Sequence, residues 1–235
     1  MLCLLCLLCL IRLLCFLCLP SPVNVEFPSS LGKGERVPTG KDNKAAAVKV
    51  TSSETLFQGR VFALNRDHIF EPGGIEAVRE VIVHPGSVVV LPVFPDGRIL
   101  LIRQYRHAAR QYMWELVAGH REPHETFLES APRELQEETG YTARRFTKLL
   151  DIYPSPGLLS EKMVIYLAEE LTKGKAKPEE DEKIATRVLP LAKVEKWISS
   201  GRIVDSKTVA GVLYYAKFAA GKRKKSTASG KRKKA

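Results

Sequence analysis

The stretch GHREPHETFLESAPRELQEETGY, from Gly119 to Tyr141, decides the fold of this chain. Thr126 is followed three residues later by Glu129, a capping-box pattern that predicts a helix beginning at this point. Gly140 is suited to end that helix, because glycine readily adopts the left-handed backbone conformation found just beyond a last helical turn. The sequence therefore predicts a helix between Thr126 and Gly140, with the acidic run RELQEE in its second half.

Pro132 lies inside the predicted helix, where it removes one backbone hydrogen bond. Two outcomes are open: the helix kinks at the proline, or Ser130 caps a second helical segment. Glu134, Glu137 and Glu138 follow the proline, so their i, i+3, i+4 spacing on one helix face is kept in either case. Such carboxylates repel one another, and Mg²⁺ or Mn²⁺, which prefer oxygen ligands, would turn the repulsion into binding. Taken alone, the cluster equally fits a solvated acidic surface.

The complete segment matches the pattern G-x5-E-x7-R-E-U-x-E-E-x-G-U, where U is an apolar residue and Tyr141 fills the last position. It resembles the Nudix box, the catalytic helix of the Nudix hydrolases. The resemblance implies a metal-dependent pyrophosphohydrolase with an α+β fold, an α/β/α sandwich with a mixed sheet. His120 and His124 could suggest a zinc site, but Pro123 between them disfavours a helix that would bring them together, and they are interpreted as loop histidines.

Charge and cysteine are both concentrated at the ends of the chain. The 235 residues carry a formal net charge of +11, but the last fourteen contain eight lysines and arginines, so the remaining body is only mildly basic. Residues 220–235, which include these fourteen, are predicted to be a disordered basic tail that could contact nucleic acid or another polyanion without sequence specificity. All five cysteines lie within the first eighteen residues. A fold without disulfides gives no support for an oxidising compartment, and a cytoplasmic location is expected.

Residues 1–20, MLCLLCLLCLIRLLCFLCLP, form an apolar Leu/Cys segment that admits three interpretations. The spacing C-x-x-C-x-x-C could bind metal, although the residues between are all leucine. A signal peptide or membrane anchor is the second, although Arg12 interrupts the run and no small-residue cleavage site follows. The third is a mis-assigned translation start, although the next methionine is Met113. Residues 21–47, rich in Pro, Gly, Ser and Lys, are predicted to be a linker.

From Val48 the sequence becomes strand-like, with short apolar stretches separated by turn-forming residues. Residues 48–84 resemble a small N-terminal antiparallel sheet through which the family forms dimers, and 85–219 would be the Nudix domain. The turn Pro95-Asp96-Gly97 predicts a hairpin between two buried strands. The expected elements are strands at 61–64, 81–83, 87–93, 99–105, 149–153 and 163–167, and amphipathic helices at 191–199 and 206–218.

Residues 54–219 resemble one branch of the superfamily, the ADP-ribose pyrophosphatases. A proline-rich stretch after the Nudix box marks substrates of the ADP-ribose type in this branch, and here it reads YPSPGLLSE, residues 153–161. The implied reaction is metal-dependent hydrolysis of ADP-ribose to AMP and ribose 5-phosphate. The other stretches that carry the resemblance are REV at 79–81, HPGSVVVLP at 84–92, RQYRH at 103–107 and WELVAG at 114–119.

The resemblance also implies roles for residues of the catalytic centre. Glu134, Glu138 and the backbone carbonyl of Ala118 would bind the metal, Mg²⁺ or Mn²⁺. Glu137 would be a further ligand or a catalytic group close to the metal. Glu161 would be the general base that activates water.

Substrate contacts are implied in the same way. Arg79 and Arg106 would grip the diphosphate, for which a planar guanidinium is suited. Members of the branch often stack adenine on an aromatic residue just after the position of Gly59, where this chain has Arg60. The guanidinium of Arg60 could stack in place of the ring. The dimers of this family share active sites, so a homodimer is expected.

Three other functions remain open at the level of sequence. Another nucleoside diphosphate sugar, such as GDP-mannose, would need the same catalytic residues and different base and sugar pockets. A non-catalytic nucleotide sensor built on a Nudix domain is disfavoured, because it has no need of Glu134, Glu137 and Glu138 together. Nucleic-acid binding through the basic tail would be purely electrostatic, because no aromatic residue interrupts it.

Overall fold

The structure is a computed structural model that describes residues 48–177 and 183–221. The chain divides into two units, Met1–Ala45 and Ala46–Ala235, and every described residue belongs to the second. The predicted apolar segment and linker, and the basic tail beyond Gly221, lie outside the described residues. Within the described part of the chain, no helix is long and apolar enough to cross a membrane.

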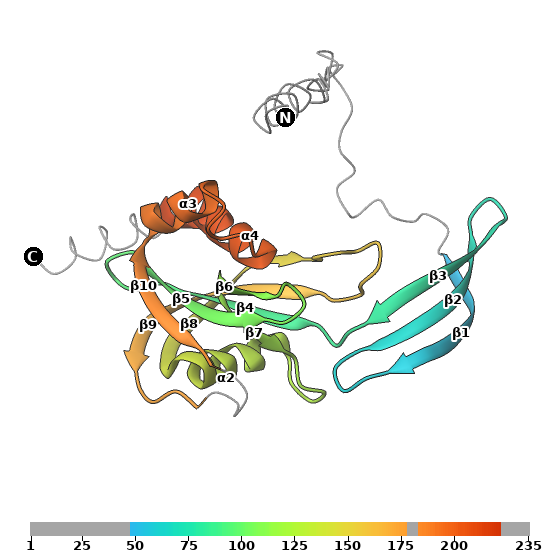
Figure 1. The fold of residues 1–235 in the computed structure, drawn as a ribbon, viewed down its shortest axis with the longest axis horizontal. Helices are drawn as coiled ribbons and strands as arrows, with labels where there is room; N and C mark the ends of the chain where they lie inside the picture. Colours follow the sequence, from blue (N-terminus) through green and yellow to red (C-terminus); the bar gives the residue numbers. More distant parts are fainter. Residues whose placement is uncertain (1–47, 178–182, 222–235) are drawn as a thin grey trace, which may run out of the picture. The chain divides into compact units, whose positions relative to one another are not determined.

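The first three strands form a separate antiparallel sheet in the order β1-β2-β3 (Figure 1). Its strands are β1 (Lys49–Gln58), β2 (Ala63–Glu71) and β3 (Ile75–Val83). Gly73 and Gly74, both with positive φ, make the turn between β2 and β3, a conformation that residues with a side chain rarely adopt. The small N-terminal antiparallel sheet predicted from the sequence is therefore confirmed.

Two further sheets make up the rest of the fold. One is antiparallel, in the order β10-β5-β6, and the other has the order β7-β4-β9-β8. In the second sheet β4 and β9 run parallel while the other neighbours are antiparallel, so the sheet is mixed, as predicted. The strands are β4 (Ser87–Pro92), β5 (Arg98–Arg106), β6 (Gln111–Glu115), β7 (Val117–His120), β8 (Tyr141–Ile152), β9 (Met163–Lys173) and β10 (Ala185–Pro190).

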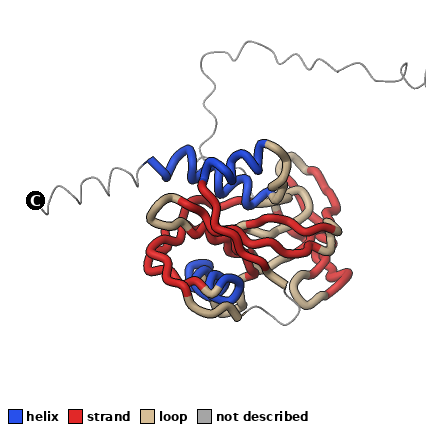
Figure 2. The backbone as a smooth tube through the Cα atoms, turned by 60° about the vertical axis from the view of Figure 1, so that its left-hand side comes forward, coloured by secondary structure: helices blue, strands red, loops and turns tan. Residues whose placement is uncertain are grey.

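Helices cover both sides of these sheets (Figure 2). Helix α2 (Phe127–Thr139) packs Leu135 against Val90 and Ile102 in one hydrophobic cluster. Helices α3 (Leu191–Ser199) and α4 (Ser206–Tyr214) pack against the opposite sides of the same strands, in a second cluster. A π-helix, Tyr215–Ala219, continues α4. The arrangement is the α/β/α sandwich of the predicted fold class. The second cluster includes Val89, Leu91, Leu101, Val194, Trp197 and Val212.

The predicted turn at Pro95–Gly97 is present, with the Gly97 amide donating to the carbonyl of Phe94 at 2.9 Å. The strands that it joins do not form an extended hairpin. They pair only at Val93 and Ile99, and β4 and β5 then belong to different sheets. The reason is that both edges of each strand are already hydrogen-bonded to other strands. Strand β4 pairs with β7 and β9, and β5 pairs with β6 and β10.

Helix α2 begins and ends where the sequence predicts. The Thr126 hydroxyl accepts from the Glu129 amide at 3.3 Å, and the Glu129 carboxylate accepts from the Thr126 amide at 2.7 Å. Gly140 ends the helix with φ of 73°. One helix contains Pro132, and the Ser130 hydroxyl donates to the Glu125 carboxylate at 2.7 Å instead of accepting from an amide. The alternative in which Ser130 caps a second helix is therefore wrong.

Candidate active site

The acidic face of α2 opens onto a cleft of about 230 Å³. Strand β7 supplies one wall and α2 another, while the turn between β1 and β2 contributes Arg60 and Val61. The cleft therefore brings the predicted metal ligands and Arg60 to one place. The other residues that line it are Ala118, Gly119, His120, Glu122, Arg133, Glu134, Glu137 and Glu138.

Gly119 allows the helix to approach strand β7 this closely. A Cβ atom at this position would lie 2.0 Å from the Glu134 carboxylate, well inside van der Waals contact. The glycine is needed for this close approach, because any side chain would displace the carboxylate. On the same strand the Ala118 amide donates to Glu138 Oε2 at 3.3 Å, so two carboxylates of α2 lie against β7.

Arg133 organises the carboxylates of the cleft. Its Nε and Nη2 donate to both oxygens of Glu125, at 2.9 and 2.8 Å. Its Nη1 donates to Glu134 at 2.7 Å and to Glu137 at 3.1 Å. Chiefly through the hydrogen bonds with Glu125, these contacts raise the pKa of Arg133 and hold the pKa of Glu125 at about 2. A single guanidinium thus neutralises part of the charge of three acidic side chains.

Glu134 and Glu138 are both buried, which is unusual for carboxylates and costs free energy unless the charge is compensated. Burial raises the pKa of Glu134, and the charge and hydrogen bond of Arg133 oppose that effect. A further cation would stabilise the charged form of such a buried carboxylate. The electrostatics of the site therefore favour binding of a cation.

The donor set fits a hard divalent cation, since Glu134, Glu137, Glu138 and the Ala118 carbonyl all offer oxygen. In the described part of the chain, no three acidic, histidine or cysteine side chains already converge as a metal site. Arg133 holds one oxygen of Glu134 and one of Glu137, so the second oxygen of each carboxylate is not held by the guanidinium.

Burial disfavours the charge of Arg106, at the end of β5, but Glu115, with smaller contributions from Glu138 and Asp205, outweighs burial and raises its pKa. Its Nε and Nη2 donate to the two oxygens of Glu115 at 2.9 and 2.7 Å. Lys207 of α4 donates to the same carboxylate at 2.5 Å. Burial favours the neutral form of Glu115, but these two cations outweigh it and lower its pKa.

Glu161 lies outside the residues that line the cleft, on the loop before β9, and is buried. The Ser87 hydroxyl donates to its Oε1, and His84 Nδ1 lies 3.7 Å from the same oxygen. Burial lowers the pKa of His84, and the charges of Glu161 and His120 act on it in opposite directions. Ser87 pairs with His120 between β4 and β7, and His120 lines the cleft, so one residue links Glu161 to the cleft lining.

Three predicted site residues, Glu161, Arg106 and Arg79, are not among the residues that line this cleft. Arg79 contacts the N-terminal sheet instead. It lies on β3, where Nη2 pairs with Glu71 at 3.0 Å, and its side chain is about half exposed. Within one chain its neighbours belong to the N-terminal sheet.

Several residues of the site were missed at the level of sequence. Arg133 and Glu125 occupy fixed positions of the Nudix pattern, so the motif itself carried the signal for them. Ser87 contacts Glu161, 74 positions away, and Lys207 contacts Glu115, 92 positions away, while Glu115 holds Arg106 at a separation of only nine. No local pattern could have identified Ser87 or Lys207.

The NUDIX domain model matches residues 83–208 of this chain. The chain is 35% identical over 173 residues to the ADP-ribose pyrophosphatase of Bacillus subtilis, covering 73% of this chain and 94% of that protein. It is 38% identical over 170 residues to the ADP-ribose pyrophosphatase of Mycobacterium tuberculosis, covering 69% and 80%. A solved ADP compounds hydrolase superposes with a TM-score of 0.66 at 25% identity, covering 74% and 95%. The chain belongs to the NUDIX family.

Proposed function

We propose that this protein hydrolyses ADP-ribose to AMP and ribose 5-phosphate with a divalent cation, Mg²⁺ or Mn²⁺. The observation that carries the proposal is the cleft in which Glu134, Glu137 and Glu138 meet Ala118 and Arg60. The similarity to two ADP-ribose pyrophosphatases over most of their length supports the substrate. A nucleotide sensor would not need Glu134, Glu137 and Glu138 together, and burial of two of them, Glu134 and Glu138, costs free energy.

Glu134, Glu138 and the Ala118 carbonyl would hold the metal, with Glu137 beside it. When bound, the cation would neutralise the diphosphate and lower the pKa of a nearby water. Arg106 would bind the diphosphate oxygens, and Arg60 would stack on the adenine. Both arginines keep their charge throughout, so they fix the substrate without exchanging protons.

Glu161 would take the proton from the attacking water. Its support is positional, since the carboxylate is buried beside the cleft and held by Ser87. His84, whose pKa is lowered by burial, contributes a mostly neutral ring at pH 7. A neutral His84 does not form an ion pair with the Glu161 carboxylate.

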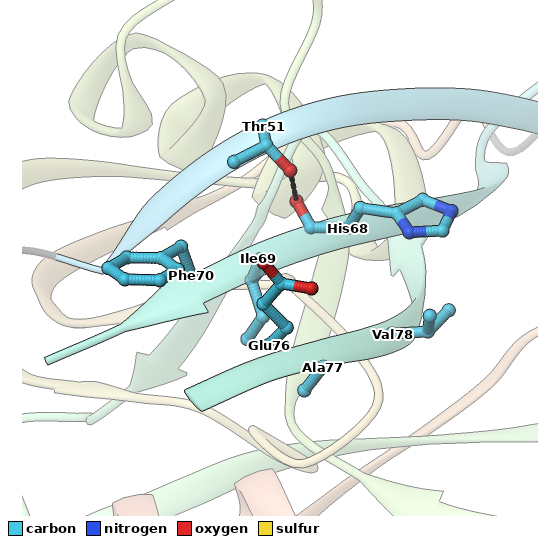
Figure 3. Close-up of a pocket in the computed structure, with 7 residues that line it drawn as sticks. All are labelled: Thr51, His68, Ile69, Phe70, Glu76, Ala77 and Val78. Atoms are coloured by element: carbon cyan, nitrogen blue, oxygen red, sulfur yellow. Dashed lines mark hydrogen bonds between the residues drawn. The ribbon is translucent and has the colours of Figure 1, made fainter. Parts of the chain in front are cut away.

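We also propose that the protein is a homodimer formed through the sheet β1-β2-β3. Apolar side chains are exposed on this sheet, although soluble monomers rarely expose contiguous apolar surface. A shallow cavity of about 460 Å³ lies on the same sheet (Figure 3), where the Thr51 hydroxyl donates to the His68 carbonyl at 3.1 Å. The exposed apolar residues of the three strands are Val50, Leu56, Phe57, Phe70, Ile75, Val78 and Val83.

A dimer of this kind accounts for Arg79. The side chain is exposed, and Glu71 is its one ion-pair partner among residues 48–177 and 183–221, so that a second protomer could accept it at its diphosphate site. Val78→Glu, next to Arg79, should convert the dimer to a monomer in light scattering and lower activity together with it. A monomeric wild-type protein with full activity would contradict this part of the proposal.

A cytoplasmic location and polyanion binding by the tail complete the proposal. The cysteine-free body from residue 19 onward suits a reducing compartment. The basic tail would bind nucleic acid weakly, with an affinity that falls steeply as salt rises. Filter binding at two salt concentrations, with and without residues 222–235, would detect it.

The substrate is tested by a panel of ADP-ribose, NADH, GDP-mannose, diadenosine polyphosphate and 8-oxo-dGTP with each metal. ADP-ribose should have the highest kcat/KM, and a chelator should abolish activity. If GDP-mannose is cleaved and ADP-ribose is left intact, the substrate is wrong while the catalytic centre stands. If none of these substrates is cleaved in the presence of metal, the result would support a non-catalytic nucleotide sensor.

Glu138→Gln and Glu161→Gln should fail in different ways. Glu138→Gln removes an anionic metal ligand, so the metal concentration for half-maximal activity should rise and additional Mg²⁺ should restore part of the activity. Glu161→Gln removes the base, so kcat should fall by about 10² to 10⁴ with no rescue by metal. Near wild-type activity of Glu161→Gln would transfer the role to Glu137, the next candidate.

A further inference from the structure

Four charged side chains form a buried network between α4 and the strands β5 and β6. The Lys207 ammonium donates to Glu115 at 2.5 Å and to Asp205 at 2.8 Å. Glu115 is fully buried and also receives two hydrogen bonds from Arg106. Two carboxylates and two cations balance each other, so the network carries no net charge. Lys207 is itself buried, which is rare for lysine unless it is paired.

The geometry of Arg106 leaves part of its guanidinium available. Nε and Nη2 form one edge of the guanidinium, and both face Glu115. Among residues 48–177 and 183–221, Nη1 has no hydrogen-bond partner, and the side chain is 39% exposed. The end formed by Nη1 and Nη2 can therefore receive a phosphate oxygen while Glu115 holds the adjoining edge of Nε and Nη2. Glu115 fixes the direction in which that end points.

The first helical turn of α4 holds Glu115 in place. Asp205 caps the helix by accepting from the Thr208 amide at 3.0 Å, and the Thr208 hydroxyl accepts from the Leu116 amide at 2.8 Å. Lys207 adds the side-chain contact to Glu115, the residue just before Leu116. The helix start thus holds both the main chain and the carboxylate at one point of the strand.

We propose that Lys207 is a positioning residue for diphosphate binding, acting on Arg106 through Glu115. It supplies the second positive charge that Glu115 needs. When Arg106 shares its charge with a bound diphosphate, the buried carboxylate keeps a full ion pair with Lys207. Without Lys207, binding of a diphosphate by Arg106 would leave the negative charge of Glu115 without a second cation. Arg106 would then remain paired with Glu115 and bind the diphosphate weakly. This inference rests on the proposed function, in which Arg106 binds the diphosphate.

The test compares Lys207→Met, which keeps the length of the side chain and removes its charge, with Lys207→Arg, which keeps the charge. Lys207→Met should raise KM for ADP-ribose about tenfold, change kcat less than about threefold, and leave the metal requirement unchanged. Lys207→Arg should recover most of the affinity. Arg145→Met is the matched control, because Arg145 also pairs with a buried carboxylate, but with Glu169 and not with the Glu115 that holds Arg106. Its KM should equal that of the wild type.

A double-mutant cycle separates positioning from folding. In an Arg106→Met background, Lys207→Met should change KM less than about twofold, because the residue through which it acts is gone. The same rise in KM in both backgrounds, or a loss of thermal stability alone, would overturn the proposal. If Lys207→Met does not fold, Asp205→Asn retains the helix cap and weakens the hold on Lys207. It should then raise KM in the wild-type background only.

The substrate panel distinguishes a failure of the proposed function from a failure of the role proposed for Lys207. If the wild type cleaves another diphosphate of the panel and spares ADP-ribose, the substrate is wrong, and the cycle run on that other substrate decides the role of Lys207. If it cleaves none, calorimetric titration with ADP decides. Equal affinity of the wild type and Lys207→Met for ADP, including no binding by either, would overturn the proposal.

Discussion

Replacing Glu125 by glutamine should remove a pH-dependent part of the free energy of unfolding. In the folded protein Arg133 donates to both oxygens of Glu125, and the Ser130 hydroxyl donates to one of them at 2.7 Å. These hydrogen bonds, led by those from Arg133, lower the pKa of Glu125 from 4.5 to about 2. The carboxylate form therefore stabilises the fold.

The magnitude follows from that lowering. Each pKa unit corresponds to about 1.36 kcal/mol, so the full effect would be about 3.4 kcal/mol at neutral pH. The side chain of Glu125 is 24% exposed, and solvent screens part of the interaction. Arg133 also keeps Glu134 and Glu137 as partners in the variant. We therefore expect Glu125→Gln to lower the free energy of unfolding by about 2 kcal/mol.

The sign of the pH dependence is fixed, because the folded-state pKa lies below the unfolded one. The stability is fully present above about pH 5 and is lost as the pH falls through 4.5 toward 2. Urea unfolding of both proteins in chelator should give a difference at about pH 3 that is less than half of that at pH 7. Glu54→Gln, at an exposed ion pair with Arg66, is the control and should cost almost nothing. An equal difference at both pH values would refute the reasoning.

Three further predictions concern activity. Gly119→Ala places a Cβ against the carboxylate of Glu134, so kcat/KM should fall about 10²-fold while circular dichroism stays unchanged; wild-type kinetics would contradict the close approach. Ser87→Ala removes the hydrogen bond to Glu161, so kcat should fall about tenfold at constant KM, and Ser87→Thr should restore it. A chain that ends at Gly221 should keep its kcat/KM, and a loss of more than about tenfold, roughly 1.4 kcal/mol, would place the tail at the substrate.

The elements that the sequence predicted are those whose signals are local. Both ends of α2 follow from a capping box and a glycine, and α3 follows from its amphipathic pattern and begins and ends at the predicted residues. Strands β6, β7 and β10 were not predicted. They are short, and their pairing partners on β5 and β4 define them more than their own composition does. Strand β8 was predicted only from residue 149, because its earlier half is mostly polar and half-exposed.

The residues of the candidate site also fall into those with a local sequence signal and those placed by tertiary packing. Glu134, Glu137 and Glu138 share a helix face, so the spacing of one motif was sufficient to group them. The resemblance to known pyrophosphatases added Ala118 and Arg60, which line the same cleft. The buried network behind Arg106 depends on how α4 packs against β6, and packing of this kind has no signature in the sequence of either element.

The position of Arg133 explains why the motif needs arginine next to glutamate. The guanidinium reaches Glu134 and Glu137 within its own helix and Glu125 just before it, so that three carboxylates share one internal cation. Without it, the mutual repulsion of these side chains would oppose both the helix and its close approach to Gly119. The fold thus tolerates its acidic site before any metal arrives. Arg133 holds one oxygen of Glu134 and one of Glu137, so a metal ion that binds beside it would share these two carboxylates with the guanidinium.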